Sequence, residues 1–370
     1  MVNKPLRDLK VAIVHDWLYG GGAERVVFEL HKMFPEAPIY TSYCSDEWRQ
    51  KLNGKVITGY LQHWPFSKLR KFLPVLRMRW FTHLNFTGYD LVISSSGNGE
   101  AKGIKVPKGT THVCYCHSPT HYYWRHYDEY LAHPGFGVFD PLARFGLRLL
   151  VGPLQRWDLR AAKRPDFMIA NSTQIKADIK KYYGRDSVVI FPPVDIERFT
   201  GAKAPERYGY VTMGRQVPYK HFDLVVEASS QLGIPLKVIG RGPDHERLVK
   251  LAGSNVDFLT DVTDEDMPTQ LAGAYAFLYA AEEDFGIAPP EAMAAGTPVI
   301  AYKAGGALDY VSPGKTGEFF DPQTSQALIN ALRKFDPLTY NHDEIAESAK
   351  RFSSDVFIQN MEAFLQKVFS

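Results

Sequence analysis

The stretch AFLYAAEEDFGIAPPEAMAAGTPVIAY, residues 276–302, determines the fold class of this chain. Short apolar runs at 276–281 and 298–302 enclose a loop and a segment of good helix formers. A strand, a helix and a second strand in this order form a βαβ unit, whose two strands run parallel. The stretch therefore predicts a parallel sheet covered by helices.

The loop of this unit, EDFGIAPPE, places two carboxylates eight positions apart. Pro289 and Pro290 exclude a helix through the loop, because proline lacks an N–H and restricts the residue before it. We expect Glu283 on the loop, Glu291 at the start of the helix and Gly296 at its end. Backbone N–H groups beside a helix N-terminus suit a ligand with hydroxyls and negative charge.

The same alternation of strands and helical segments continues through the whole chain, which predicts an α/β protein with helices on both faces of parallel sheets. The expected strands are 10–16, 38–44, 55–60, 90–96, 112–117, 167–172, 187–193, 209–214, 235–240, 256–260, 276–281, 298–302 and 317–321.

The length of 370 residues and the charge distribution both indicate two domains. Residues 1–190 contain 27 Lys and Arg against 16 Asp and Glu, whereas the remainder contains 16 against 25. The change falls near the prolines of FPPVDIERF. We therefore expect Rossmann-like domains at 1–192 and 193–352 that face each other across a cleft. Residues 353–370 should form an amphipathic helix that packs back toward the first domain.

Composition indicates a protein of the cytoplasm. The N-terminal segment lacks the apolar core of a secretory signal, and no apolar run reaches the ~20 residues of a membrane span. The three cysteines, Cys44, Cys114 and Cys116, are too few and odd in number for a disulfide framework, which favours a reducing compartment.

Two loops carry features of anion-binding sites. In GRQVPYKHFD (214–223), Arg215 and Lys220 bracket a turn between a strand and a helix, where a bound anion would offset their charge. Two solvated surface cations are the alternative. The glycines of DWLYGGGAER (16–25) would let a ligand approach the backbone, although a simple tight turn also explains them.

The segment HVCYCHSPTHYYW (112–124) is rich in histidine and cysteine. A metal site is the alternative that we disfavour, since a C-x-C spacing without a second pair is unusual for zinc. His117 falls where the strand ends, at the edge of a parallel sheet that binds ligands. A histidine that only caps the strand is the competing interpretation.

The tract between Glu47 and Asp90 contains no acidic residue. Its cations and aromatics favour an anionic membrane surface, with a solvated basic face as the alternative, and nothing in it resembles a nucleic-acid-binding module. The residues are Arg49, Lys51, Lys55, Lys68, Arg70, Lys71, Arg77 and Arg79, with Trp64, Phe66, Phe72, Trp80 and Phe81.

Taken together, these motifs resemble glycosyltransferase family 4, retaining enzymes with the GT-B fold. The resemblance extends over nearly the whole chain and includes the Glu283–Glu291 spacing, Arg215 with Lys220, GGGAER, ANSTQIKADIKKYYG and FPPVDIERF. The details HDW, CYCHSPTHYYW and EEDFG are most similar to the bacterial and archaeal O-antigen mannosyltransferases.

The resemblance implies a role for each matching residue. Arg215 and Lys220 would hold the diphosphate of a nucleotide sugar, Glu283 the hydroxyls of the sugar and Glu291 those of the ribose. The catalytic group would consist of Arg215, Lys220, Glu283 and His117. His117 would approach the transferred sugar. The remaining nucleotide-sugar contacts would come from Gly21, Gly22, Gly240, Leu259, Asp264 (at a guanine edge), Phe285, Gly286 and Ile287.

The function implied is retaining transfer of a sugar, mannose from GDP-mannose as the first choice, to a lipid-linked or glycan acceptor in the synthesis of cell-envelope polysaccharide such as lipopolysaccharide. Neither a cofactor nor a metal is expected, and the protein would bind the inner face of the cell membrane peripherally. A UDP-sugar donor and a nucleotide-sugar epimerase of the same fold are the alternatives.

Overall fold

Two units with parallel sheets make up the protein. The computed structural model describes residues 5–69, 73–97, 99–125, 127–132, 137, 140–204 and 206–370. Residues 1–192 and 358–370 group into unit 1, and residues 193–357 into unit 2. Arg70, Lys71 and Phe72 of the basic tract lie outside the described residues.

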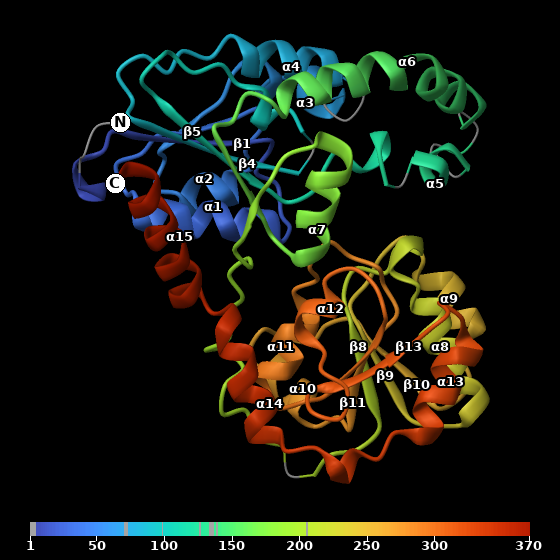
Figure 1. The fold of residues 1–370 in the computed structure, drawn as a ribbon. Helices are drawn as coiled ribbons and strands as arrows, with labels where there is room; N and C mark the ends of the chain where they lie inside the picture. The colour runs from blue at the N-terminus through green and yellow to red at the C-terminus, as the bar shows by residue number, and fades with distance from the viewer. Residues whose placement is uncertain are drawn as a thin grey trace. The chain divides into compact units, whose positions relative to one another are not determined.

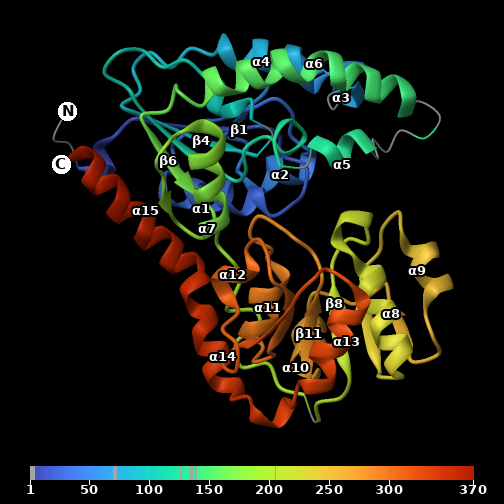
Figure 2. The same cartoon turned by 45° about the vertical axis from the view of Figure 1, so that its right-hand side comes forward.

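Unit 1 contains a seven-stranded parallel sheet with the order β3-β2-β1-β4-β5-β6-β7. In Figures 1 and 2, α1 and α2 lie below this sheet and α4 and α6 above it. The strands are β1 (Val11–His15), β2 (Ile39–Thr41), β3 (Val56–Ile57), β4 (Leu91–Ser96), β5 (Thr111–Cys116), β6 (Phe167–Ala170) and β7 (Val188–Val189).

The α-helices of unit 1 differ widely in length. They are α1 (Ala23–Met33), α2 (Asp46–Lys51), α3 (Phe66–Leu69), α4 (Pro74–Thr82), α5 (Tyr127–Ala132), α6 (Asp140–Ala161) and α7 (Thr173–Asp178). One core cluster joins Ala12 and Val14 of β1 to Phe81 of α4, all buried. Side chains two positions apart on a strand share a face, so this cluster fixes which face of the sheet α4 covers.

Unit 2 contains a six-stranded parallel sheet with the order β10-β9-β8-β11-β12-β13. Helices α8, α9 and α13 cover one face, where Val226, Val238, Leu278 and Leu328 form part of the core. The strands are β8 (Tyr210–Met213), β9 (Leu236–Ile239), β10 (Val256–Leu259), β11 (Ala276–Tyr279), β12 (Val299–Tyr302) and β13 (Gly317–Phe320).

The remaining α-helices belong to the C-terminal half of the chain. They are α8 (Phe222–Leu232), α9 (His245–Leu251), α10 (Met267–Ala272), α11 (Ala288–Ala294), α12 (Ala307–Tyr310), α13 (Ser325–Lys334), α14 (His342–Ala349) and α15 (Ser354–Phe369). Helix α15 begins in unit 2, and its residues from Ile358 onward group with unit 1, where the ring of Phe364 lies 6.1 Å from that of Phe167.

The α/β class with two parallel sheets is confirmed, and each of the thirteen expected strands is present in the order that the sequence predicted. The strands expected at 55–60 and 187–193 are shorter in the structure, with two residues each in β3 and β7. Both are edge strands, which pair with one neighbour only. On α15, Phe357, Met361, Leu365 and Val368 are buried and Phe364 is half-buried, as an amphipathic helix requires.

Candidate functional site

The carboxyl-terminal edge of the unit 2 sheet has the geometry of a ligand site. Strand β8 lies between β9 and β11, so the chain leaves β8 toward one side and β11 toward the other. Open α/β sheets bind ligands at such a reversal of strand order, because the diverging loops leave a crevice there. Residues 214–221 follow β8 at this edge, and residues 280–287 follow β11.

An ion pair joins these two loops. Lys220 Nζ lies 2.9 Å from Glu283 Oε1, and the hydroxyl of Tyr279 donates to Glu283 Oε2 at 2.5 Å. The side chains of Lys220 and Glu283 are 19% and 21% exposed, so a ligand can reach both. The sequence offers Lys220 no acidic neighbour within its own loop, and the structure supplies one, Glu283, from the loop after β11.

Arg215 is exposed immediately after β8, next to Gly214. Gly214 has φ +146°, and a Cβ there would lie 3.4 Å from Lys220 Nζ. Gly240, with φ +111°, packs against this turn, since a Cβ on it would lie 2.5 Å from the carbonyl oxygen of Gly214. The N–H of Gly240 donates to Leu259 at 2.9 Å. Gly240 and Leu259 therefore support the turn that carries Arg215.

Glycines also shape the loop after β11. Gly286 has φ +79°, and a Cβ there would lie 2.5 Å from the Tyr279 hydroxyl. Phe285 is buried, with its ring 5.9 Å from that of Tyr310. The N–H of Gly306 donates to the carbonyl of Glu283 at 2.9 Å, which holds this loop against the turn that follows β12. Ile287 is the residue directly before α11.

The start of α11 differs from the expectation. The helix begins at Ala288, three residues before Glu291, and includes both prolines in its first turn. Proline is tolerated there because the first N–H groups of a helix have no intrahelical acceptor. Glu291 is buried in this first turn, and the helix ends before Gly296, which has φ +74° as a helix terminator requires.

Asp264 lies apart from the charged loops, between β10 and α10. Its side chain is 90% exposed and lies 3.1 Å from Arg198. The structure thus leaves its carboxylate open to solvent.

Unit 1 has its own reversal of strand order, between β1 and β4. His117, which follows β5, is buried with its Nε2 2.8 Å from Ser95 Oγ. His15 Nδ1 lies 2.9 Å from the carbonyl oxygen of Ser95 and 3.0 Å from its Oγ. A carbonyl only accepts, so His15 Nδ1 carries a proton. The Ser95 hydroxyl thus lies within hydrogen-bond distance of both His15 and His117.

Asp16 closes the same edge and was missed by the sequence reasoning. Its carboxylate is buried and accepts from the N–H of Gly97 at 2.8 Å and of Ala101 at 2.7 Å. Asp16 follows β1 and the N–H groups that donate to it follow β4, so the bonds tie the two diverging loops together. Its place directly after a strand was the available signal, since polar residues there meet at one edge.

The glycine loop 20–22 lies next to the N-terminus of α1. Gly20 has φ +135° and Gly22 precedes the helix. The carboxylate of Glu24 accepts from the N–H groups of Tyr19 at 3.3 Å and of Gly20 at 3.0 Å. A Cβ on Gly21 would lie 3.0 Å from Glu24 Oε2. Glu24 therefore holds the loop in its turn.

The histidine and cysteine side chains of β5 belong to the core of unit 1. His112 Nε2 lies 2.8 Å from Ser94 Oγ, and burial lowers the pKa of His112 to about 3. Burial raises the pKa of Cys114 to about 11. Within the described ranges, no three His, Cys, Asp or Glu side chains gather as a metal site would require.

The basic tract is in part structural. Arg77 is buried, 2.6 Å from Glu100, and Phe81 is buried in the core. Lys51 and Lys55 form surface ion pairs with Glu47 and Glu36 at 2.7 and 2.9 Å. Trp64, by contrast, is 77% exposed.

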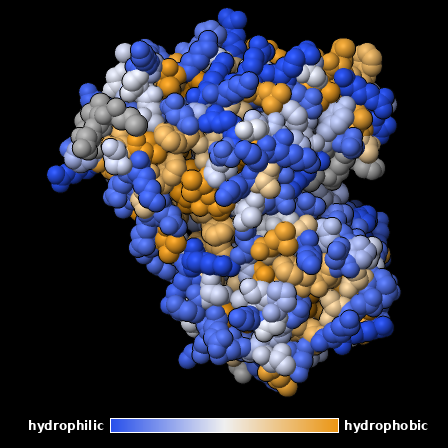
Figure 3. Space-filling view, in the orientation of Figure 1, coloured by the Kyte–Doolittle hydropathy of each residue, from blue (hydrophilic) through white to orange (hydrophobic). Residues whose placement is uncertain are grey.

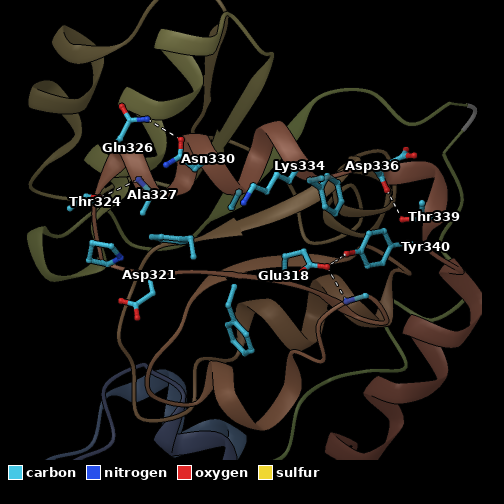
Figure 4. A pocket seen from close by; sticks show the side chains of 16 residues that line it. Glu318, Asp321, Thr324, Gln326, Ala327, Asn330, Lys334, Asp336, Thr339 and Tyr340 are labelled. Atoms are coloured by element: carbon cyan, nitrogen blue, oxygen red, sulfur yellow. Dashed lines mark hydrogen bonds between the residues drawn. The ribbon is translucent and has the colours of Figure 1, made fainter.

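Figure 4 shows a pocket of about 760 Å³ beside β13 and α13, at the edge of the unit 2 sheet away from β8. Its lining includes Glu318, Asp321, Lys334 and Asp336, and none of the site residues expected from the sequence. Size alone therefore does not locate the site in this unit.

Comparisons with known proteins identify the class. Residues 193–352 match the family model of glycosyl transferases group 1, and residues 20–198 match that of glycosyltransferase family 4. The structure of Anabaena HepE in complex with UDP has a similar fold, with a TM-score of 0.70 and 19% identity over 97% of this chain and 100% of that one. The protein is a glycosyltransferase. It belongs to family 4 and has the GT-B fold, as the sequence predicted.

Two relatives show what similar chains do. The GDP-mannose-dependent alpha-(1-6)-phosphatidylinositol monomannoside mannosyltransferase of Mycolicibacterium smegmatis is 32% identical over 38% of this chain and 44% of its own length. The alpha-1,3/1,6-mannosyltransferase alg2 of Schizosaccharomyces pombe is 24% identical over 96% of this chain and 80% of its own length.

Proposed function

We propose that this glycosyltransferase moves mannose from GDP-mannose to a lipid-linked or glycan acceptor, with retention of the anomeric configuration. The observation that carries the proposal is the Lys220–Glu283 contact of 2.9 Å at the strand-order reversal of unit 2. A cation for phosphate and a carboxylate for hydroxyls thereby lie side by side on separate loops. The names of both relatives support mannose, and that of the first supports GDP-mannose.

Each residue has a separate task in this proposal. Arg215 and Lys220 bind the diphosphate, and Glu283 accepts hydrogen bonds from the hydroxyls of the sugar. Each carboxylate oxygen has two lone pairs, so Glu283 can accept from a ligand while it keeps Tyr279 and Lys220. Glu291 binds the ribose hydroxyls. The N–H groups of residues 285–287 contact sugar and phosphate, and Asp264 meets the guanine edge.

The reaction breaks the bond between the anomeric carbon and the diphosphate. Negative charge develops on the leaving oxygen, and the cations of Arg215 and Lys220 stabilise it, so that no metal or cofactor is needed. The acceptor hydroxyl attacks on the face that the diphosphate leaves, and the departing phosphate takes its proton. His117 approaches the transferred sugar, and Gly21 and Gly22 form a loop over the phosphates.

The acceptor belongs to the cell envelope in this proposal, as in lipopolysaccharide synthesis, and the enzyme works on the inner face of the cell membrane without spanning it. No helix in the described parts of the chain is long and apolar enough to cross a bilayer. The excess of Lys and Arg in residues 1–190 supports contact with anionic lipid, since each cation near such a surface contributes about 1 kcal/mol.

A UDP-sugar donor is the second candidate, because HepE was crystallised with UDP in the same fold. Incubation with GDP-mannose and with UDP-sugars distinguishes the donors. Slow release of GDP and free mannose is the expected result, since a transferase without an acceptor passes the sugar to water. Release from a UDP-sugar alone would replace the donor, and an epimerised nucleotide sugar without hydrolysis would contradict the proposal.

A further inference from the structure

Helix α6 is long, but little of it is buried. Of its 22 residues, only Asp158 and Ala161, near its C-terminal end, are buried. Asp158 anchors this end, since its carboxylate accepts from Lys102 at 2.5 Å and from the indole of Trp124 at 2.7 Å. No side chain of α6 before Asp158 is buried in the core of unit 1.

Large apolar side chains of α6 face solvent. Leu142 is 69% exposed, and Phe145 and Leu149 are each 65% exposed. Their spacing of three and four places them on one face of the helix. Leu150 beside them is 49% exposed. Figure 3 shows apolar and strongly hydrophilic side chains intermixed on the surface around α4 and α6.

The charge of this face has one sign. Between Asp140 and Asp158 the helix contains no carboxylate, whereas Arg148 and Arg156 are exposed. Arg156 lies seven residues after Leu149 and continues the same face. Arg156 thus lies beyond the apolar side chains on the same face, and Arg148 lies beside them.

We propose that α6 is the element that docks unit 1 on an anionic lipid bilayer. Leu142, Phe145 and Leu149 enter the boundary between headgroups and acyl chains, and the arginines bind lipid phosphates. A second copy is a poorer occupant, because a symmetric contact would bring two basic helices together, with no carboxylate between Asp140 and Asp158 to balance Arg148. The inference rests on the proposed membrane function and names a different surface from the tract 48–89, whose Arg77 and Phe81 are buried.

A fluorescent probe tests the docking directly. The three native cysteines are buried, so a cysteine introduced at Phe145 takes an environment-sensitive dye selectively. Val249→Cys on α9 is the matched control, because Val249 is also an exposed apolar residue, 46% accessible, but lies in unit 2. With vesicles containing phosphatidylglycerol we expect a blue shift and a gain in emission at position 145 and no change at position 249.

Partition of unlabelled protein gives the second measurement. The triple substitution Leu142→Gln, Phe145→Gln and Leu149→Gln should lower partition onto anionic vesicles at least about tenfold, since three apolar anchors are lost. Circular dichroism confirms that this variant is folded, because the three side chains are exposed. Val249→Gln should leave partition unchanged.

These experiments distinguish docking through α6 from the membrane association on which this inference rests. If the native protein binds anionic vesicles and the triple variant binds equally well, α6 is not the docking element although membrane association stands. If the native protein does not bind at low salt, the proposed membrane association fails. A native dimer in the absence of lipid that the triple variant abolishes would assign this face to a second copy and overturn the inference.

Discussion

Ser95 contacts two histidines, one of which the proposed reaction uses. Its carbonyl fixes a proton on Nδ1 of His15, and its hydroxyl lies 2.8 Å from Nε2 of His117. The neighbouring Ser94 contacts His112 on the opposite face of β4. The pair offers a substitution and its matched control one position apart.

Ser95→Ala should lower kcat for transfer about fivefold to tenfold and leave GDP affinity unchanged, because one hydrogen bond of roughly 1 kcal/mol that orients His117 is lost. Ser94→Ala, with the same loss of volume, should leave kcat near the native value. Nitrogen-15 NMR of the histidines supplies a readout independent of activity. The ring signals of His117 should change in Ser95→Ala and not in Ser94→Ala, and unchanged His117 signals in Ser95→Ala would contradict this orienting role.

The residues of the proposed donor site were predicted from the sequence largely because several motifs resemble one family. Their contacts were not. The Lys220–Glu283 pair joins the loops after β8 and β11, and only the strand order, which no local pattern encodes, makes these loops neighbours. The bonds of Asp16 to Gly97 and Ala101 were missed for the same reason.

At the scale of elements, the strands were predictable because each is a short apolar run that a buried parallel sheet requires. Boundaries were less so. The two prolines before Glu291 mark the region of a helix start, but proline suits the first turn as well as the preceding loop, so the sequence alone placed the start three residues late. The exposure of the apolar side chains of α6 was not predictable from the sequence either, because it depends on which elements pack beside the helix.

The buried His112 on strand β5 should make the stability of the protein depend on pH. His112 is fully buried, and burial, with a smaller contribution from Arg164, lowers its pKa from 6.5 to about 3. Between pH 6.5 and about 3, His112 therefore binds a proton in the unfolded chain but stays neutral in the folded chain. The stability that neutral His112 contributes is complete above pH 6.5 and is lost as the pH falls toward 3.

Between pH 6.5 and 5 this group alone should cost about 2 kcal/mol of the free energy of unfolding, at about 1.4 kcal/mol per pH unit. His112→Gln should flatten the pH dependence of urea unfolding by this amount, and His83→Gln, at an exposed site, should not. Parallel curves for native protein and His112→Gln would show that His112 titrates normally in the folded state.

Across the whole molecule, the two units differ in net charge and in the surface that each presents to a ligand. Residues after 190 are acidic in sum, with 25 Asp and Glu against 16 Lys and Arg, yet the edge of the unit 2 sheet presents Arg215 and Lys220. A local pair of cations within an acidic unit favours a specific anionic ligand over a general attraction to polyanions. The basic half holds α6 and its exposed apolar face.

In the proposed function, the loops after β8 and β11, together with α11, bind a nucleoside diphosphate. Titration calorimetry with GDP tests it on native protein, Arg215→Ala, Glu291→Ala and Glu283→Ala, with Lys334→Ala as a control cation on the far side of unit 2. Arg215→Ala should weaken GDP binding about tenfold to a hundredfold, since a charge-assisted hydrogen bond is worth roughly 1.5–3 kcal/mol. Glu291→Ala should also weaken it, whereas Glu283→Ala and Lys334→Ala should not. Native affinity in Arg215→Ala would contradict the account.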